Sequence, residues 1–211
     1  MSLFPIFLKL EGRPCLVVGA GAVAESKVKG LLEAGAVVRV VAPRATSVIQ
    51  QLARDADLRW LPRAFELEDL EGVFLVVVAT SSPELNEHIF REARKRRALC
   101  NVVDDPPDCD FYYPSVVRRG DLQIAISSAG HSPALAQRLR KELDRQLETE
   151  YAEWLAGLGR VRRGLYRRSM DNSLRHALLH RLASRERFEL FLQRRRSRQE
   201  RGIKAGVGHE G

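Results

Sequence analysis

The stretch RPCLVVGAGAVAESKVKGLLEAGAVVRVVAP, residues 13–43, decides the fold. It opens with an apolar run, passes through a glycine-rich turn into apolar residues at helical spacing, and ends in a β-branched run. The run at 15–18 predicts a buried strand, the middle predicts a helix that stops at Gly35, and residues 37–41 predict a second strand. The stretch therefore predicts a strand, helix and strand of a parallel sheet.

The turn follows the pattern GxGxxA, with Gly19, Gly21 and Ala24 at its three defining positions. The first glycine permits a tight turn, the second lets the backbone approach a pyrophosphate, and the small third residue allows close packing of helix on strand. Because the pattern lies between a predicted strand and a predicted helix, a dinucleotide site is favoured over a turn that binds nothing. The helix is expected to turn four apolar side chains inward: Val23, Val28, Leu31 and Leu32.

The end of the second predicted strand lacks one part of the dinucleotide pattern. An acid is expected there to hold the ribose 2′-hydroxyl, but the chain reads Ala42, Pro43 and Arg44. The turn therefore leaves the choice between NAD and NADP open, and Arg44 would suit a 2′-phosphate.

Further strands and a helix are predicted downstream, with strands in 57–62, 72–80 and 98–103 and a helix in 82–97. Strands that alternate with helices predict an α/β fold with a doubly wound, Rossmann-like parallel sheet. Ligands of such sheets bind outside the carboxyl ends of the strands. Thr80 and Asp104 fall at such ends, and Thr80 is therefore a candidate cofactor contact.

The composition is that of a globular protein with a sizeable core, since 45% of the 211 residues are hydrophobic and 29% are charged. The N-terminus shows no long apolar run and no signal-peptide pattern, so we expect a cytoplasmic protein without membrane association. The cysteines, Cys15, Cys100 and Cys109, are odd in number and lack CxxC spacing, which argues against a disulfide framework and a zinc site.

Charge divides the chain near residue 150. Residues 1–150 hold 20 Lys and Arg against 21 Asp and Glu, whereas residues 151–211 hold 15 against 6. We expect an NAD-binding domain over 1–113, a substrate and dimerisation region over 114–150, and a basic helical region over 151–211. The arginines of the basic helical region are interpreted as solvating helix faces, because no RNA-binding signature accompanies them. No nucleic-acid partner is therefore expected.

A helix is predicted to begin after the two apolar runs that follow residue 114. Ser132 is a suitable N-cap and Pro133 a suitable first residue. An apolar stripe then follows at Leu135, Leu139, Leu143 and Leu147. Such a stripe is typical of a core or a dimer seam, so we expect a homodimer.

Two long segments, FPIFLKLEGRPCLVVGAGAVAESK (4–27) and NVVDDPPDCDFYYPSVVRRGDLQIAISSAGHSPALAQRLRKEL (101–143), occur in a characteristic order. Together they resemble the precorrin-2 dehydrogenase and sirohydrochlorin ferrochelatase module of siroheme synthase. The resemblance covers roughly residues 3–150. It implies oxidation of precorrin-2 to sirohydrochlorin with NAD, and in some members the insertion of ferrous iron as well.

The resemblance also implies roles for individual residues. Asp104, the first acid of NVVDD, matches the acid/base residue, and Ser128, the second serine of AISSAGHSP, matches a residue that lines the tetrapyrrole site. The positions that line the dinucleotide site are matched by Ala22, Val23, Pro43 and Arg44. Since members of the family use NAD, the resemblance favours NAD where the turn alone leaves the choice open.

The substrate of this family carries many carboxylates, and arginines or lysines clamp such groups. Candidate clamps are Arg118, Arg119, Arg138, Arg140 and Lys141, each of which is equally compatible with a solvated surface. No resident metal site is expected, because iron would be a substrate. His131 is interpreted as a surface residue, and Asp105, Asp108 and Asp110 as turn residues whose carboxylates cap backbone amides.

One alternative is a binding protein that senses redox state through the dinucleotide fold and contacts another macromolecule through its basic tail. Such a sensor needs the glycine turn but has no use for Asp104, Ser128 and the arginines together. The sequence therefore favours an enzyme.

Overall fold

The computed structural model of the protein describes residues 3–206, with side-chain surroundings through residue 197. The chain divides into two compact units, Met1–Tyr113 and Pro114–Gly211. The three functional regions predicted from the sequence, 1–113, 114–150 and 151–211, stay a prediction.

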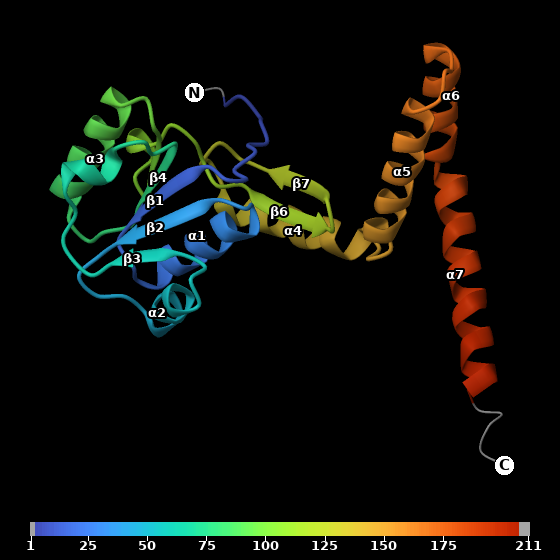
Figure 1. Ribbon diagram of the computed structural model, residues 1–211, viewed down its shortest axis with the longest axis horizontal. Coiled ribbons are helices and arrows are strands. Elements are labelled where there is room, and N and C mark those ends of the chain that lie inside the picture. The colour runs from blue at the N-terminus through green and yellow to red at the C-terminus, as the bar shows by residue number, and fades with distance from the viewer. Residues whose placement is uncertain (1–2, 207–211) are drawn as a thin grey trace. The chain divides into compact units, whose positions relative to one another are not determined.

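The first unit is built on a parallel sheet of five strands in the order β3-β2-β1-β4-β5 (Figure 1). All four strand pairs are parallel. The strands predicted from the sequence are confirmed, and their order places β1 at the centre, where the chain reverses its direction of winding. Their bounds are β1 Pro14–Val18, β2 Val37–Val41, β3 Arg59–Leu61, β4 Leu75–Val78 and β5 Leu99–Val102.

Helices cover both faces of this sheet. α1 (Ala22–Glu33) and α2 (Ser47–Arg54) pack on one face, while α3 (Pro83–Lys95) packs on the other. Successive strand residues alternate between the two cores, as Val17 and Leu16 show, because side chains of a strand point to opposite faces. The fold is therefore doubly wound, as predicted, although the sequence analysis did not identify α2.

One detail of the predicted α1 is wrong. Val28 and Leu31 are buried against the sheet as expected, but Val23 is 51% exposed. Ala24 takes the inward position in the first turn and is 1% exposed. A small residue is needed there because the helix begins directly above the strand that precedes it.

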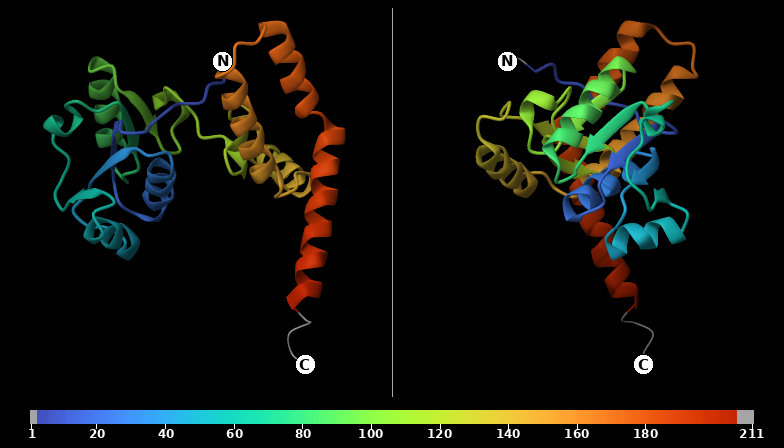
Figure 2. Two further views of the ribbon diagram at one scale, coloured as in Figure 1. Left: turned by 45° about the vertical axis from the view of Figure 1, so that its right-hand side comes forward. Right: turned by 90° about the vertical axis from the view of Figure 1, so that its left-hand side faces the viewer.

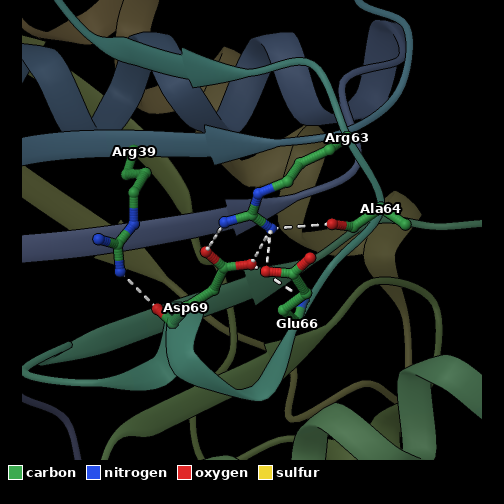
Figure 3. Close-up of polar contacts among 5 residues, drawn as sticks. All are labelled: Arg39, Arg63, Ala64, Glu66 and Asp69. Carbon is green, nitrogen blue, oxygen red and sulfur yellow. Dashed lines mark hydrogen bonds and ion pairs between the residues drawn. The ribbon is translucent and has the colours of Figure 1, made fainter.

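A buried carboxylate holds the connection between β3 and β4. Asp69 lies in the short 3₁₀ helix η1 (Leu67–Leu70) and is 3% exposed. Its carboxylate accepts two hydrogen bonds from Arg63, of 2.7 and 2.8 Å, and one of 3.0 Å from the amide of Glu66 (Figure 3). Arg39 of β2 donates to the Asp69 carbonyl at 2.5 Å. The network ties the crossover segment to the middle of the sheet.

The ionised form of Asp69 is stabilised in the fold. Burial by itself raises the pKa of this carboxyl, but the hydrogen bonds from Arg63 and the Glu66 amide, together with the charges of Arg63 and Arg39, bring it below its ordinary value. A carboxyl that binds its proton more weakly when folded contributes stability above the unfolded pKa of about 3.9. That stability is lost as the pH falls through the lower folded value.

We therefore expect Asp69→Asn to lower the free energy of unfolding by about 2 kcal/mol at neutral pH. The loss should shrink as the pH falls below about 4, where wild type loses the same interaction. Urea unfolding at a series of pH values checks this, with Asp57→Asn on the exposed surface as the control. A constant loss from pH 7 to pH 3 would contradict the ionic role.

The second unit begins with an antiparallel hairpin of β6 (Ser115–Arg119) and β7 (Leu122–Ile126). α4 (Pro133–Gln146) packs against β6 and β7. Its start is as predicted, since the Ser132 hydroxyl accepts from the Leu135 amide at 3.2 Å and Pro133 is the first helical residue. Leu147, the last residue of the predicted stripe, caps the helix.

Three further helices complete this unit: α5 (Tyr151–Tyr166), α6 (Asn172–Leu182) and α7 (Arg185–Gly206). All three lie in the region 151–211 that was predicted to be helical. α5 and α7 lie side by side (Figure 2), with the rings of Tyr151 and Phe188 stacked 4.1 Å apart. Within residues 3–206, no helix has the length and apolar character needed to cross a membrane.

Candidate active site

The predicted cofactor residues and the predicted acid meet at one edge of the sheet. Gly19 follows β1, Pro43 follows β2, Thr80 follows β4 and Asp104 follows β5. Since all these strands are parallel, their carboxyl ends share this edge. The edge also lies at the reversal of winding beside β1, where open α/β sheets bind their ligands.

Gly19 shapes the turn between β1 and α1. Its φ is +100°, and a Cβ placed on it would lie 2.2 Å from the carbonyl oxygen of Ala79, which follows β4. Its amide donates a 2.9 Å hydrogen bond to Val41 of β2. Any side chain would collide with the backbone that follows β4, so the first glycine of the pattern is required by packing as well as by its backbone angle.

Gly21 has a different role, because the space beside it is open. It is the N-cap of α1, its side-chain position meets no atom within 4 Å, and no side chain caps the helix. The first turn is therefore accessible to an anion, which the amides and the helix dipole favour. Ala22 and Val23 are also exposed at this turn, so an apolar surface lies next to the anion position.

The other predicted cofactor residues differ in how accessible their side chains are. Pro43 and Arg44 are exposed directly after β2. The Thr80 hydroxyl donates to Oδ1 of Asn86 at 2.5 Å and accepts from the Ser82 amide at 3.2 Å. Thr80 therefore helps to form the start of α3, and its contact with a cofactor stays a prediction.

Asp104 stands apart from the other acids of its loop. Its φ is +62°, a left-handed conformation that is uncommon for residues other than glycine. Strained backbone of this kind clusters at functional sites. Asp104 is exposed, and within the part of the chain that the structure describes its carboxylate has no hydrogen bond or ion pair. A free carboxylate at this edge is suited to accept a proton.

The rest of the acidic loop is folded back onto β5. The Asp110 carboxylate accepts from the Cys100 amide at 3.0 Å, and Asn101 donates to the Phe111 carbonyl at 2.8 Å. Cys109 donates from Sγ to the Val102 carbonyl at 3.1 Å. The Asp110 carboxylate therefore bonds to an amide of β5, ten residues away, and the predicted capping of its own turn is not what this bond does. The predicted capping is wrong for Asp105, which precedes the short 3₁₀ helix η2 (Pro106–Asp108) without a capping side-chain bond.

Lys27 of α1 is a neighbour that the sequence analysis did not single out. Its ammonium lies 3.7 Å from the centre of the Tyr113 ring. Burial lowers the pKa of Lys27, and the negative charge of Asp104 opposes that shift. The ammonium therefore contributes positive potential at Asp104. No local pattern reveals this contact, since it depends on how the loop returns across α1.

The predicted substrate residues belong to the second unit. The Ser128 hydroxyl accepts from the Ser132 amide at 3.1 Å, in a turn where Ala129 and Gly130 both have positive φ. Arg138 pairs with Glu142 at 2.9 Å on the surface of α4. Arg118 is exposed on β6, and His131 is exposed in the turn. The exposure of His131 agrees with its interpretation as a surface residue, whereas the substrate contacts of Ser128, Arg118 and Arg138 stay predictions.

Arg119 is bound to its own fold. Its guanidinium donates to the Leu147 carbonyl at 2.8 and 3.0 Å, to the Asp144 carbonyl at 2.5 Å and to the Asp144 carboxylate at 3.0 Å. These bonds satisfy carbonyls at the end of α4, which lack partners within the helix. The geometry therefore supports a capping role for Arg119, and its predicted substrate contact is untested.

Comparison with known proteins identifies the family to which the chain belongs. A family model described as putative NAD(P)-binding matches residues 6–115, and one described as sirohaem biosynthesis protein central matches residues 119–146. A solved structure of SirC, a precorrin-2 dehydrogenase, has a TM-score of 0.76 and 30% identity, over 91% of this chain and 98% of SirC. The chain belongs to the precorrin-2 dehydrogenase and siroheme synthase family.

Longer members of this family are also similar to the chain. Siroheme synthase 1 of Serratia proteamaculans is 45% identical over 77% of this chain and 34% of its own length. Siroheme synthase of Neisseria meningitidis serogroup C is 42% identical over the same shares. The chain thus spans about a third of these curated relatives.

The glycine turn makes a direct test of the cofactor site. We expect Gly21→Asp to fold normally, because aspartate is a favourable N-cap and the space is open. Its charge should weaken NAD binding by more than about tenfold, because like charges then meet at the pyrophosphate. Calorimetric NAD titration and thermal unfolding check both parts.

Gly30→Asp is the control for this variant. Gly30 lies near the other end of α1, and its side-chain position also meets no atom within 4 Å. We expect it to leave NAD affinity within about twofold, because a charge more than two turns away lies beyond the anion position. Unchanged NAD affinity in Gly21→Asp would contradict the assignment of the dinucleotide site to this turn.

Proposed function

We propose that the chain catalyses the NAD-dependent dehydrogenation of precorrin-2 to sirohydrochlorin. The observation that carries the proposal is the free, strained Asp104 on the same sheet edge as the open glycine turn. The likeness to the precorrin-2 dehydrogenase SirC over nearly the whole of both chains supports the choice of substrate.

The residues at the sheet edge fit a dinucleotide. The first turn of α1 would receive the pyrophosphate, because Gly21 leaves it open and no side chain caps it. The remaining proposed contacts are Gly19, Ala22, Val23, Pro43, Arg44 and Thr80. When bound, NAD supplies a hydride acceptor.

Dehydrogenation removes a hydride and a proton from the macrocycle. In this proposal the Asp104 carboxylate takes the proton as general base, so that the electron pair of the broken C–H bond stays in the new double bond. Lys27 contributes positive potential beside Asp104.

Binding of the substrate is assigned to the second unit. Ser128, Arg118 and Arg138 are proposed contacts for the polar groups and carboxylates of the tetrapyrrole, since arginine pairs well with carboxylates. Arg119 is proposed to position these three side chains indirectly, because it holds the end of α4 to β6. The cytoplasmic location stays a prediction.

Iron insertion is proposed as a second reaction of the same carboxylate. Its basis is the likeness to siroheme synthases, whose named product contains iron. Within the described residues, no group of three or more His, Cys, Asp and Glu side chains is arranged to hold a metal ion. In this proposal ferrous iron is a substrate, and Asp104 would accept a proton released from a ring nitrogen.

Asp104→Asn tests the shared base. The variant keeps the size of the side chain but cannot accept the proton, so turnover of precorrin-2 should fall by about 100-fold or more while NAD affinity changes little. Asp105→Asn removes one negative charge from the same loop and should retain activity, since Asp105 makes no capping side-chain bond. NADH absorbance measures dehydrogenation, and siroheme absorbance measures iron insertion.

The two assays separate the alternatives. Parallel losses in Asp104→Asn support one base for both reactions, whereas normal iron insertion would restrict Asp104 to dehydrogenation. Full dehydrogenation by Asp104→Asn would contradict its role as base. If wild type binds NAD and catalyses neither reaction, the redox-sensor alternative replaces the enzyme.

We also propose a homodimer formed through α4. Leu135 of the predicted stripe is 42% exposed, which leaves an apolar side chain for a second copy. Leu135→Glu is expected to shift the protein toward the monomer, because a charge would be buried in the interface. Light scattering at micromolar concentration measures this, and Leu174→Glu on exposed α6 is the matched control. A wild-type monomer would exclude the dimer.

A further inference from the structure

Two histidines on α6 converge in a way that the dehydrogenase reaction does not use. His176 and His180 lie one helical turn apart, and both are exposed. Their Nε2 atoms are 3.0 Å apart, and their ring centres are 4.2 Å apart. Residues four apart share one face of a helix, so the two imidazoles can act on one ligand.

The helix gives this pair a fixed spacing. α6 begins at Asp171, whose carboxylate accepts from the amides of Ser173 and Leu174 at 2.8 and 3.1 Å. The neighbouring Arg175 donates to Asn172 and to the Met170 carbonyl, and its guanidinium lies 4.5 Å from the centre of the Tyr166 ring. Its positive charge is thereby held toward the start of the helix.

We propose that His176 and His180 form a surface site for a divalent transition-metal ion, with both Nε2 atoms as ligands. Neutral imidazole is a common ligand for such ions. With metal–nitrogen bonds of about 2.1 Å, a separation of 3.0 Å corresponds to an angle of about 90° at the metal. A tetrahedral angle would need about 3.4 Å.

The angle favours ions that accept ligands at right angles. Square-planar and octahedral ions such as Cu²⁺ and Ni²⁺ meet this condition, whereas tetrahedral Zn²⁺ would require the rings to separate. Water would complete the coordination, because the described residues contain no group of three or more His, Cys, Asp and Glu side chains suited to a metal. The site is distinct from the sheet edge of the first unit.

Ni²⁺ titration of the whole protein, followed by calorimetry, tests the proposal. Wild type should bind one equivalent, and His176→Asn and His180→Asn should each weaken binding by at least about tenfold, since even loss of an outer-shell partner costs that much. His88→Asn, His131→Asn and His209→Asn are controls that should retain the site.

A variant with unchanged histidine content separates spacing from number. His176→Asn combined with Ser173→His places the two imidazoles seven residues apart, about 10 Å along the helix, where one ion cannot contact both. It should bind as weakly as His176→Asn alone, while circular dichroism shows the same helix content. Wild-type affinity in this variant, or in either single variant, would overturn the proposal.

Discussion

The close approach of Gly19 to the end of β4 is the constraint on which the cofactor edge depends. A Cβ at this position would lie 2.2 Å from the Ala79 carbonyl, and the Gly19 amide also bonds to β2. The turn can therefore start α1 directly over the centre of the sheet. This placement leaves the amides of the first turn facing the edge where ligands bind.

The acidic loop after β5 depends on a different set of bonds. Asn101 and Asp110 tie the returning chain to the strand, and the thiol of Cys109 adds a bond to Val102. With both sides of the loop held, Asp104 is kept in its left-handed conformation. The anchoring bonds thus give the exposed carboxylate a defined position, which is what a proton acceptor requires.

Asp69 and Asp104 carry the same side chain in two different environments, one buried and one exposed. Asp69 is buried, and three hydrogen bonds to its carboxylate satisfy its charge, so its contribution is to stability. Asp104 is exposed, and its carboxylate has no hydrogen bond or ion pair within the residues that the structure describes. A saturated carboxylate is a poor base, while an unsaturated one is available for chemistry.

The sequence by itself determined the order of the strands in the first unit, the helices α1 and α3, the glycine turn, the start of α4 and the position of Asp104 at a strand end. These features follow from periodicity and from local backbone preferences, which act over a few residues. Tertiary structure alone decided that Val23 faces outward, that Arg119 holds α4, that Asp69 meets Arg63 and Arg39, and that Lys27 meets Tyr113. These contacts join residues that are far apart in the sequence and depend on how helices and strands pack against one another. A local sequence pattern does not specify that packing.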